Sequence, residues 1–373
     1  MKKPNTPALQ SCPSGRRGSI KRAFLALLAL ILLLGVIGSA AVSRGAGSMA
    51  TEDVRAEILA LEKNKPFAAA LKEALVLRSP AGGESEPPHH EAAIYAHFPR
   101  RSSGVEDEPS APIVFIHGTP DTMGAWAPLL FGPGAMEGQE SIYTLEVIGH
   151  GMANSESGPY PFQRCADFVA NSIDGLGLEN VTLVGNSYGA EFCWRAAADR
   201  PDLISKLVLI DSSGLPRTED QFLSEEVKMR DWSVARYGYL LNSEERVAFA
   251  LDPHFDGAAD QDRVRETFLG LENRGNWNAM IDLVRDENGA RKDDLGSLAM
   301  PTLLIFGEHD QAYPPETFGR EFEERIPNAR LEVIEGAGHY PHEQRPAEVA
   351  GLILNFHRRG LAGGDPDRDI NAK

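Results

Sequence analysis

The chain has 373 residues and a formal net charge of −17, with 37 Lys and Arg against 54 Asp and Glu. This acidity argues against a surface that binds nucleic-acid phosphate, so we expect no nucleic-acid partner. Hydrophobic residues make up 42% and charged residues 24% of the chain, which excludes a largely disordered or fibrous protein. The charge is uneven: no acid precedes Glu52, and without the six basic residues up to Arg22, 31 Lys and Arg against 54 Asp and Glu give −23.

The N-terminal region resembles a membrane leader. Residues 23–43 form an uncharged and mainly apolar run, and about 20 apolar residues span a bilayer core. Because the basic residues precede this run, the positive-inside rule predicts a single-pass transmembrane anchor, with residues 1–22 as a cytoplasmic basic leader and the body outside, tethered to the lipid bilayer. A cleavable signal peptide, followed by secretion, is the alternative, since small residues at 38–41 offer cleavage sites.

Two cysteines fall in predicted helices of the exported body. An oxidising compartment would permit a disulfide between Cys165 and Cys193. We expect two small buried thiols instead and keep the disulfide as the alternative.

The body then alternates strands and helices. Helical spacing predicts a stalk or linker helix over residues 44–73, broken at Pro66, with a helix that packs on the domain as the alternative. Several of the following short runs are apolar throughout, as in strands that are covered on both faces. The alternation specifies an α/β fold with a mostly parallel eight-stranded sheet flanked by helices, whose first two strands pair antiparallel through the loop 82–91. The predicted strands are residues 74–77, 92–96, 113–116, 142–148, 181–184, 207–210, 302–306 and 331–334.

One long interval interrupts this alternation. Residues 212–299 contain no convincing strand, so we predict a helical cap inserted between two strands at the carboxyl edge of the sheet. The core domain then comprises residues 74–211 and 300–359, and residues 360–373 are a predicted disordered tail. The amphipathic patches of the cap are residues 222–241, 244–251, 261–271 and 277–284.

A candidate nucleophile lies in the segment Gly185-Asn186-Ser187-Tyr188-Gly189. The segment follows a predicted strand and opens a predicted helix, which is the context that a G-x-S-x-G nucleophile elbow requires. The glycines remove Cβ atoms that would clash at so sharp a turn. An ordinary helix-capping serine is the alternative interpretation.

A serine hydroxyl needs a base, and the base needs an orienting acid. His339 follows the last predicted strand in a loop of small residues, and Asp310 follows the strand before it. The order Ser187, Asp310, His339 is that of a hydrolase triad. Asp211, at the end of an earlier strand, is the alternative acid.

Acyl chemistry also needs N–H donors aimed at the developing oxyanion. The Tyr188 N–H, at a predicted helix start, is one candidate. The Thr119 N–H in His117-Gly118-Thr119-Pro120 is the other, and we expect a structural role for the His117 ring.

The chain resembles the capped branch of the α/β-hydrolase fold, which includes esterases, haloalkane dehalogenases, epoxide hydrolases, cofactor-free perhydrolases and C–C hydrolases. The resemblance implies an α/β-hydrolase fold and no cofactor. Dehalogenases and epoxide hydrolases need an aspartate where this chain has Ser187, which argues against both activities. A second departure is Glu146, with extra residues after it, in a loop that usually begins with Asp. The segments that carry the resemblance are HGTPDTMGAW (117–126), GHGMANS (149–155), VGNSYGA (184–190), LVLIDSSG (207–214), PTLLIFGEHD (301–310) and IPNARLEVIEGAGHYPHEQRP (326–346).

Hydrolysis of small or medium carboxylic esters is therefore the predicted activity. C–C bond hydrolysis or perhydrolase chemistry with the same triad is the alternative, and a non-catalytic binding protein is the rival from another class. Tyr340 and Pro341 after the histidine favour an esterase over a C–C hydrolase. We expect no metal site, because His89-His90 has no other ligands near it in sequence. The predicted pocket residues are Trp126, Met152, Trp232, Tyr237 and Trp277.

Overall fold

The computed structural model describes residues 49–78, 89–101, 111–136, 138, 140–153, 158–218, 242–255 and 257–363. All of them belong to the unit Gly45–Lys373. The predicted leader and anchor (1–43) and most of the predicted tail lie outside the described residues. Among the described helices, none combines the length and the apolar character needed to cross a membrane.

Eight strands form one sheet in the order β1-β2-β4-β3-β5-β6-β7-β8. β2 is antiparallel to both β1 and β4, and all other neighbours are parallel. The predicted mostly parallel eight-stranded sheet is confirmed, as is the antiparallel pairing of the first two strands. The strands are β1 (Leu71–Arg78), β2 (His89–Phe98), β3 (Ile113–Ile116), β4 (Ile142–Glu146), β5 (Val181–Asn186), β6 (Ile204–Ile210), β7 (Thr302–Gly307) and β8 (Ala329–Ile334).

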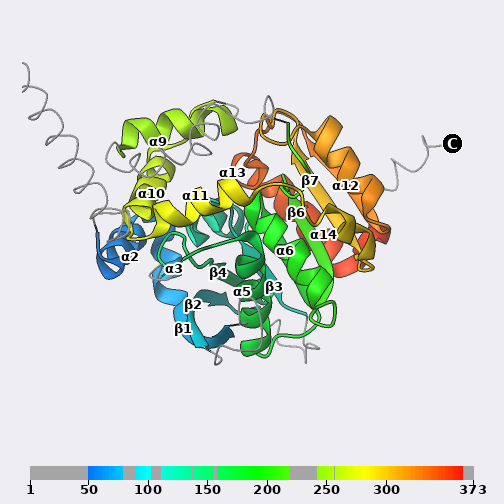
Figure 1. Ribbon diagram of the computed structural model, residues 1–373, viewed down its shortest axis with the longest axis horizontal. Coiled ribbons are helices and arrows are strands. Elements are labelled where there is room, and N and C mark those ends of the chain that lie inside the picture. The colour runs from blue at the N-terminus through cyan, green and yellow to red at the C-terminus, as the bar shows by residue number, and fades with distance from the viewer. Residues whose placement is uncertain are drawn as a thin grey trace, which may run out of the picture. The chain divides into compact units, whose positions relative to one another are not determined.

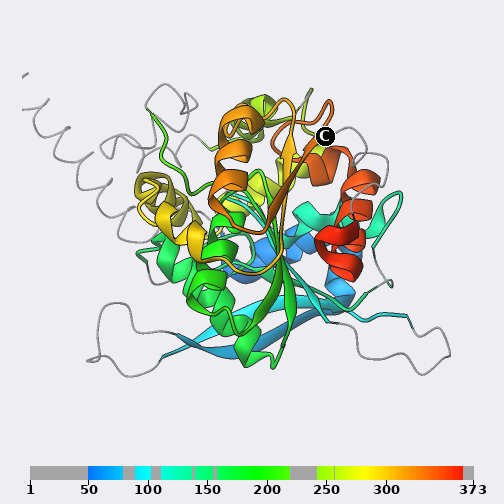
Figure 2. The same ribbon diagram turned by 90° about the vertical axis from the view of Figure 1, so that its right-hand side faces the viewer.

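Helices cover both faces of the sheet (Figures 1 and 2). In Figure 2, α5 and α6 (green) lie to the left of the sheet and α14 (red) to the right. The described α-helices are α2 (Thr51–Ala60), α3 (Lys65–Ala70), α4 (Ala127–Phe131), α5 (Phe162–Gly175), α6 (Tyr188–Asp199), α9 (Glu244–Leu251), α10 (Gln261–Glu272), α11 (Asn276–Asp286), α12 (Arg320–Arg325), α13 (Pro341–Gln344) and α14 (Pro346–Arg359).

The central strands are apolar on both faces because each face has its own core. Val114 and Ile116 of β3 belong to one hydrophobic cluster, with side chains from α5, α6 and α12. Ile113 and Phe115 of the same strand belong to the other, with side chains from α4 and α14. Alternate side chains of a strand point to opposite faces, so an unbroken apolar run is what a strand between two helical layers requires.

The N-terminal segment differs from the predicted stalk. A helix over residues 44–73 was expected, but α2 ends at Ala60, the 3-10 turn η1 (Glu62–Asn64) and α3 follow, and β1 begins at Leu71. Pro66 lies in the first turn of α3, where proline is tolerated because its missing N–H has no intrahelical acceptor. The side chains of Val54, Ile58 and Phe67 are fully buried in the core, so this segment is part of the domain.

Strand β4 is shorter than the predicted run 142–148. It ends at Glu146, because the His150 N–H turns back to the Val147 carbonyl (3.1 Å) and Gly149 adopts a φ of 78°. Val147 and Ile148 are apolar because they are buried in a turn, which composition alone does not distinguish from a strand.

The cap consists of helices in the part of residues 212–299 that the structure describes. α9, α10 and α11 coincide closely with three of the predicted patches, and the fourth, residues 222–241, lies outside the described residues. Figure 1 shows α9 at the top of the view, with β1 and β2 at the bottom. Cys165 and Cys193, both described, are buried and are not joined by a disulfide, so the expectation of two buried thiols holds.

Candidate active site

Ser187 lies on the tight turn between β5 and α6, with φ 56° and ψ −125°. A non-glycine residue at positive φ is strained, and such strain persists only where the surrounding structure enforces it. A Cβ on Gly185 would lie 2.5 Å from the Gly189 carbonyl oxygen, and a Cβ on Gly189 would collide with the His117 carbonyl oxygen. Strand, turn and helix therefore approach more closely than side chains would allow, and Ser187 is held at the carboxyl edge of the sheet.

His339 and Asp310 meet at the same edge. The Nδ1 atom of His339 is 2.8 Å from Oδ2 of Asp310, and both side chains are buried. Burial alone would raise the pKa of Asp310, but His339 outweighs it, so the pKa lies below its ordinary value. An ionised Asp310 accepts a hydrogen bond from Nδ1–H, which leaves Nε2 of His339 as the proton acceptor.

Asp211, the alternative acid, ends β6 with a φ of 44°. One of its carboxylate oxygens accepts the Gly307 N–H at 2.9 Å. Burial, and then the charge of Asp310, raise the pKa of Asp211 well above its ordinary value, which favours its protonated form. Its ligand atoms, those of Asp310 and those of His339 lie within 4.8 Å of one another. The His339 Nδ1 atom carries the proton that it donates to Asp310, so this group suits proton chemistry better than metal binding.

The loop after β3 passes directly beside Ser187. A Cβ on Gly118 would lie 3.0 Å from the Cβ of Ser187, which brings Thr119 of that loop next to the elbow. Tyr188 is the first residue of α6, and the first N–H groups of a helix have no intrahelical acceptor and carry a partial positive charge. Thr119 and Tyr188 line one cavity together with Ser187 and His339.

Two buried histidines hold this loop. His117 Nδ1 donates to the Gly118 carbonyl (2.8 Å), and its Nε2 accepts the Val147 N–H (3.1 Å). His150 Nδ1 donates to a carbonyl at 2.9 Å, so its Nε2 accepts from the Thr119 hydroxyl at 2.5 Å. Burial lowers the pKa of both rings, that of His150 to about 3, which keeps them neutral. The structure therefore gives His117 the structural contacts that were expected, and His150 acts in the same way.

The departure at Glu146 also has a structural explanation. Its two carboxyl oxygens accept the N–H groups of Met123 (2.9 Å) and Met152 (2.8 Å), and burial raises its pKa to about 8. Glu146 thereby joins the loop after β4 to the 3-10 turn that follows the Thr119 loop.

A cavity of about 390 Å³ lies between these residues and the cap. Ser187 and His339 line it at the sheet edge, and the cap contributes mainly apolar side chains. Such a division suits a ligand with one polar reacting group and an apolar chain. The apolar wall includes Val247 and Leu251 of α9, Leu271 of α10, and Trp277, Met280 and Val284 of α11.

Residues 113–352 match the family model described as alpha/beta hydrolase family. The chain belongs to the alpha/beta hydrolase family. The carboxylesterase YbfK of Bacillus subtilis is 24% identical over 271 residues, which cover 70% of this chain and 83% of that protein. The 2-hydroxymuconate semialdehyde hydrolase of Pseudomonas putida is 25% identical over 260 residues, which cover 66% and 86%. The solved structure of a membrane phospholipase A, a novel bacterial virulence factor, aligns with a TM-score of 0.63 and 20% identity over 89% of this chain and 98% of that chain, which shows a shared fold.

The predicted pocket residues of this alpha/beta hydrolase differ in where the structure places them. Trp277 lines the cavity. Trp126 is fully buried against Phe115, 4.9 Å between ring centroids, because the 3-10 turn at 123–126 directs it into the core. Met152 is also buried in that core, so neither residue is a cavity residue. Trp232 and Tyr237 lie outside the described residues.

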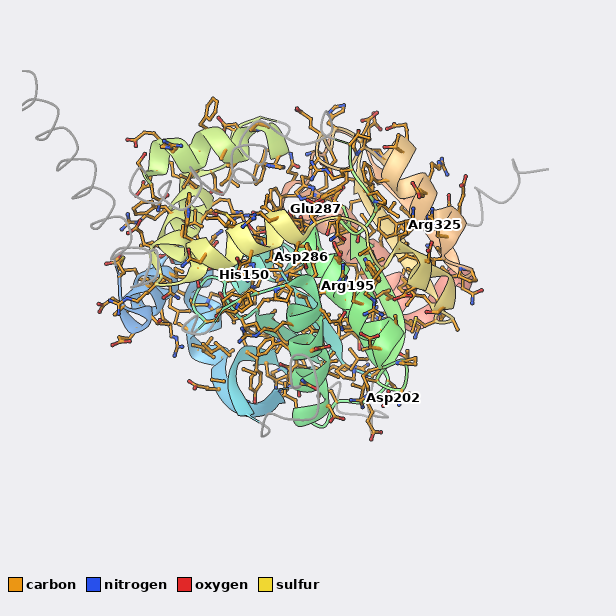
Figure 3. All side chains as sticks on the ribbon, in the orientation of Figure 1. His150, Arg195, Asp202, Asp286, Glu287 and Arg325 are labelled. Carbon is orange, nitrogen blue, oxygen red and sulfur yellow. The ribbon has the colours of Figure 1, made fainter. Side chains whose placement is uncertain are left out.

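Several site contacts of the hydrolase were not predicted. The His339 N–H donates to the carbonyl of His254 in the cap at 2.8 Å. Glu287, labelled in Figure 3 directly after α11, accepts hydrogen bonds from the hydroxyls of Tyr188 and Tyr313, both at 2.8 Å. The i, i+3, i+7 spacing of Trp277, Met280 and Val284 would have indicated the apolar wall, whereas nothing in the sequence marks His254 or Glu287.

Proposed function

We propose that this protein is a serine hydrolase that cleaves carboxylic esters through an acyl-enzyme. The observation that carries the proposal is the 2.8 Å His339–Asp310 hydrogen bond beside a cavity that Ser187 also lines. An oriented imidazole next to a strained serine turn is the arrangement that activates a hydroxyl nucleophile.

In the proposed reaction, the Ser187 hydroxyl attacks the ester carbonyl carbon while Nε2 of His339 takes its proton. The N–H groups of Thr119 and Tyr188 donate to the resulting oxyanion. The C–O bond to the leaving group then breaks, and the His339 imidazolium protonates the departing alcohol. Water, deprotonated by His339, attacks the acyl-enzyme carbonyl carbon. The bond to the Ser187 oxygen then breaks, the His339 imidazolium returns the proton to that oxygen, and the carboxylic acid is released. Asp310 stays ionised throughout and stabilises the imidazolium.

The cavity favours an acid component with a short or medium apolar chain. The chain would lie against the wall formed by α9, α10 and α11, and the scissile carbonyl would lie at the polar side. The carboxylesterase among the relatives supports ester chemistry. The 2-hydroxymuconate semialdehyde hydrolase keeps C–C hydrolysis as the activity to be tested beside it.

The test is a panel of p-nitrophenyl esters from acetate to laurate, measured beside a vinylogous 1,5-diketone. We expect hydrolysis of the esters, with loss of activity in Ser187→Ala and full activity in Ser297→Ala, which removes a surface hydroxyl. Cleavage of the diketone with no cleavage of the esters would overturn the ester assignment. Peroxide-dependent oxidation without hydrolysis would favour perhydrolase chemistry.

We also propose that residues 23–43 anchor the protein in a membrane, with the hydrolase domain outside the cytoplasm. The basic residues before this apolar run support this orientation. Alkaline extraction of membranes should leave the full chain in the pellet, and protease added to spheroplasts should digest the domain. N-terminal sequencing that begins near residue 42, with the protein in the soluble fraction, would show a cleaved signal peptide instead.

A further inference from the structure

A buried cluster of charged side chains lies outside the reacting groups of the proposed site. Its centre is in helix α10 of the cap, where Arg263 is 1% and Glu266 0% exposed at the side chain. Burying ions is costly unless each is paired, and an apolar helix face would pack against the core as well. Packing of the cap on the core therefore does not by itself explain why these two positions are charged.

Arg263 joins the two loops that carry the proposed chemistry. Its Nη2 atom is paired with Asp121, which is fully buried and lies two residues after Thr119. Its Nε atom donates at 3.0 Å to Glu343 of α13, the short helix that follows the His339 loop. The guanidinium also lies over the ring of Tyr340, 5.0 Å from the ring centroid. One side chain of the cap thus touches the loop of the proposed oxyanion donor and the loop of the proposed base.

Glu266, three residues further along α10, strengthens the same connection. It accepts the Thr122 hydroxyl at 2.5 Å, in the turn that follows Asp121. It also accepts the Asn64 amide at 2.8 Å and pairs with Lys63 at 2.7 Å. The segment η1 before the sheet therefore supports the loop of Thr119 through Glu266.

The electrostatics agree with fixed charges at these positions. Burial would raise the pKa of Asp121 and of Glu266, but Arg263 in the first case, and Lys63 with Arg263 in the second, outweigh it, so both values lie below the ordinary ones. Both carboxylates stay ionised. The Arg263–Asp121 and Glu266–Lys63 ion pairs therefore join the cap to the core, one through a cation of the cap and the other through an anion of the cap.

We propose that Arg263 and Glu266 are positioning residues, which hold the Thr119 loop in register with the His339 loop so that the cap completes the oxyanion site. The proposal rests on the proposed ester-hydrolase function. Because the oxyanion exists only in the transition state, misplacing its donor lowers kcat more than it raises KM.

The test compares Arg263→Lys with Arg265→Lys in the full-length protein. Arg265 is the matched control: it lies on the same helix and pairs with Glu57 (3.3 Å) and Glu244 (2.6 Å) at the surface, away from both loops. With p-nitrophenyl butyrate, Arg263→Lys should lower kcat about 10- to 100-fold, in the range for a misplaced oxyanion donor, with KM within about threefold. Arg265→Lys should change neither constant by more than about twofold.

Glu266→Gln provides a second test of the positioning role, which applies also if Arg263→Lys does not fold. It retains an acceptor for the Thr122 hydroxyl but loses the charge that pairs with Lys63, and should lower kcat about three- to tenfold at unchanged KM. In the double variant the two effects should be less than additive, because both act on one loop.

Wild-type kcat in either variant, correctly folded by circular dichroism, would overturn the proposal, and so would loss of folding in both variants. A wild-type protein that hydrolyses no ester would instead overturn the proposed function, and the positioning role would be rejected with it.

Discussion

The turn around Ser187 and the cap helix α10 both contribute to one site, but they are built from different interactions. At the turn, backbone segments approach so closely that Gly185 and Gly189 have no room for a Cβ. At α10, contact with the core depends on long charged side chains, Arg263 and Glu266, in buried ion pairs. At the turn the constraint is steric and acts on the backbone, so almost no side chain is tolerated at the two glycines, whereas at α10 it acts on the charge of two side chains.

This difference explains which features the sequence could predict. The G-x-S-x-G turn, the loop of Thr119 and the order of Asp310 and His339 are visible because each requirement lies within a few residues of a strand end. The Arg263–Asp121 pair joins residues 142 positions apart, and Asn64–Glu266 joins residues 202 apart. No local pattern distinguishes such charges from solvated ones on an amphipathic helix.

Hydrophobic periodicity predicted the strands of the sheet and the helices α9 to α11. It did not predict against which part of the molecule an apolar side chain packs. Trp126 was expected in the pocket because it is aromatic and close to the Thr119 loop, yet it packs in the core. The segment before β1 was expected as a stalk or a packing helix, and the burial of Val54 and Ile58 agrees with packing. Its position before the sheet, and not its composition, suggested a linker.

The largest expected effect is the loss of kcat on substitution of Asp310, compared with that on substitution of Asp211. Asp310→Asn replaces the acceptor of the His339 Nδ1–H with an amide and should lower kcat about 10⁴-fold, the size expected for a wrong histidine tautomer. Asp211→Asn keeps a donor beside Asp310 and should cost less than about tenfold. Steady-state kinetics on one ester compares them, and equal losses would mean that both acids orient His339.

A backbone substitution tests the first region directly. Gly189→Ala places a methyl group against the His117 carbonyl and should reduce the free energy of unfolding by about 3 kcal/mol or more. Gly351→Ala is the control, since a Cβ there has nothing within 4 Å on helix α14, and should stabilise by about 0.5–1 kcal/mol. Urea unfolding measures both, and a neutral Gly189→Ala would contradict the close approach.

The cap wall should determine the length of the acyl chain. Met280→Trp fills part of the apolar side of the cavity, so kcat/KM for an octanoate ester should fall about tenfold or more while that for acetate changes little. A parallel fall for both esters would show that the chain lies elsewhere.

The smallest expected effect concerns His150, which links the Thr119 hydroxyl to the loop after β4. Its pKa falls from 6.5 to about 3 in the folded protein, so the unfolded chain binds the extra proton between these values. Stability is therefore complete above pH 6.5 and should decrease by about 1.4 kcal/mol per pH unit below it through this residue. Urea unfolding from pH 7.5 to 5.5 should show a shallower slope in His150→Gln, and identical slopes would contradict a neutral buried ring.

Active-site labelling tests the central claim most directly. A fluorophosphonate should react with one group per chain, peptide mapping should place the adduct on Ser187, and Ser187→Ala should take up none. Labelling of the wild type at another residue, or equal labelling of Ser187→Ala, would contradict the account of Ser187 as the nucleophile.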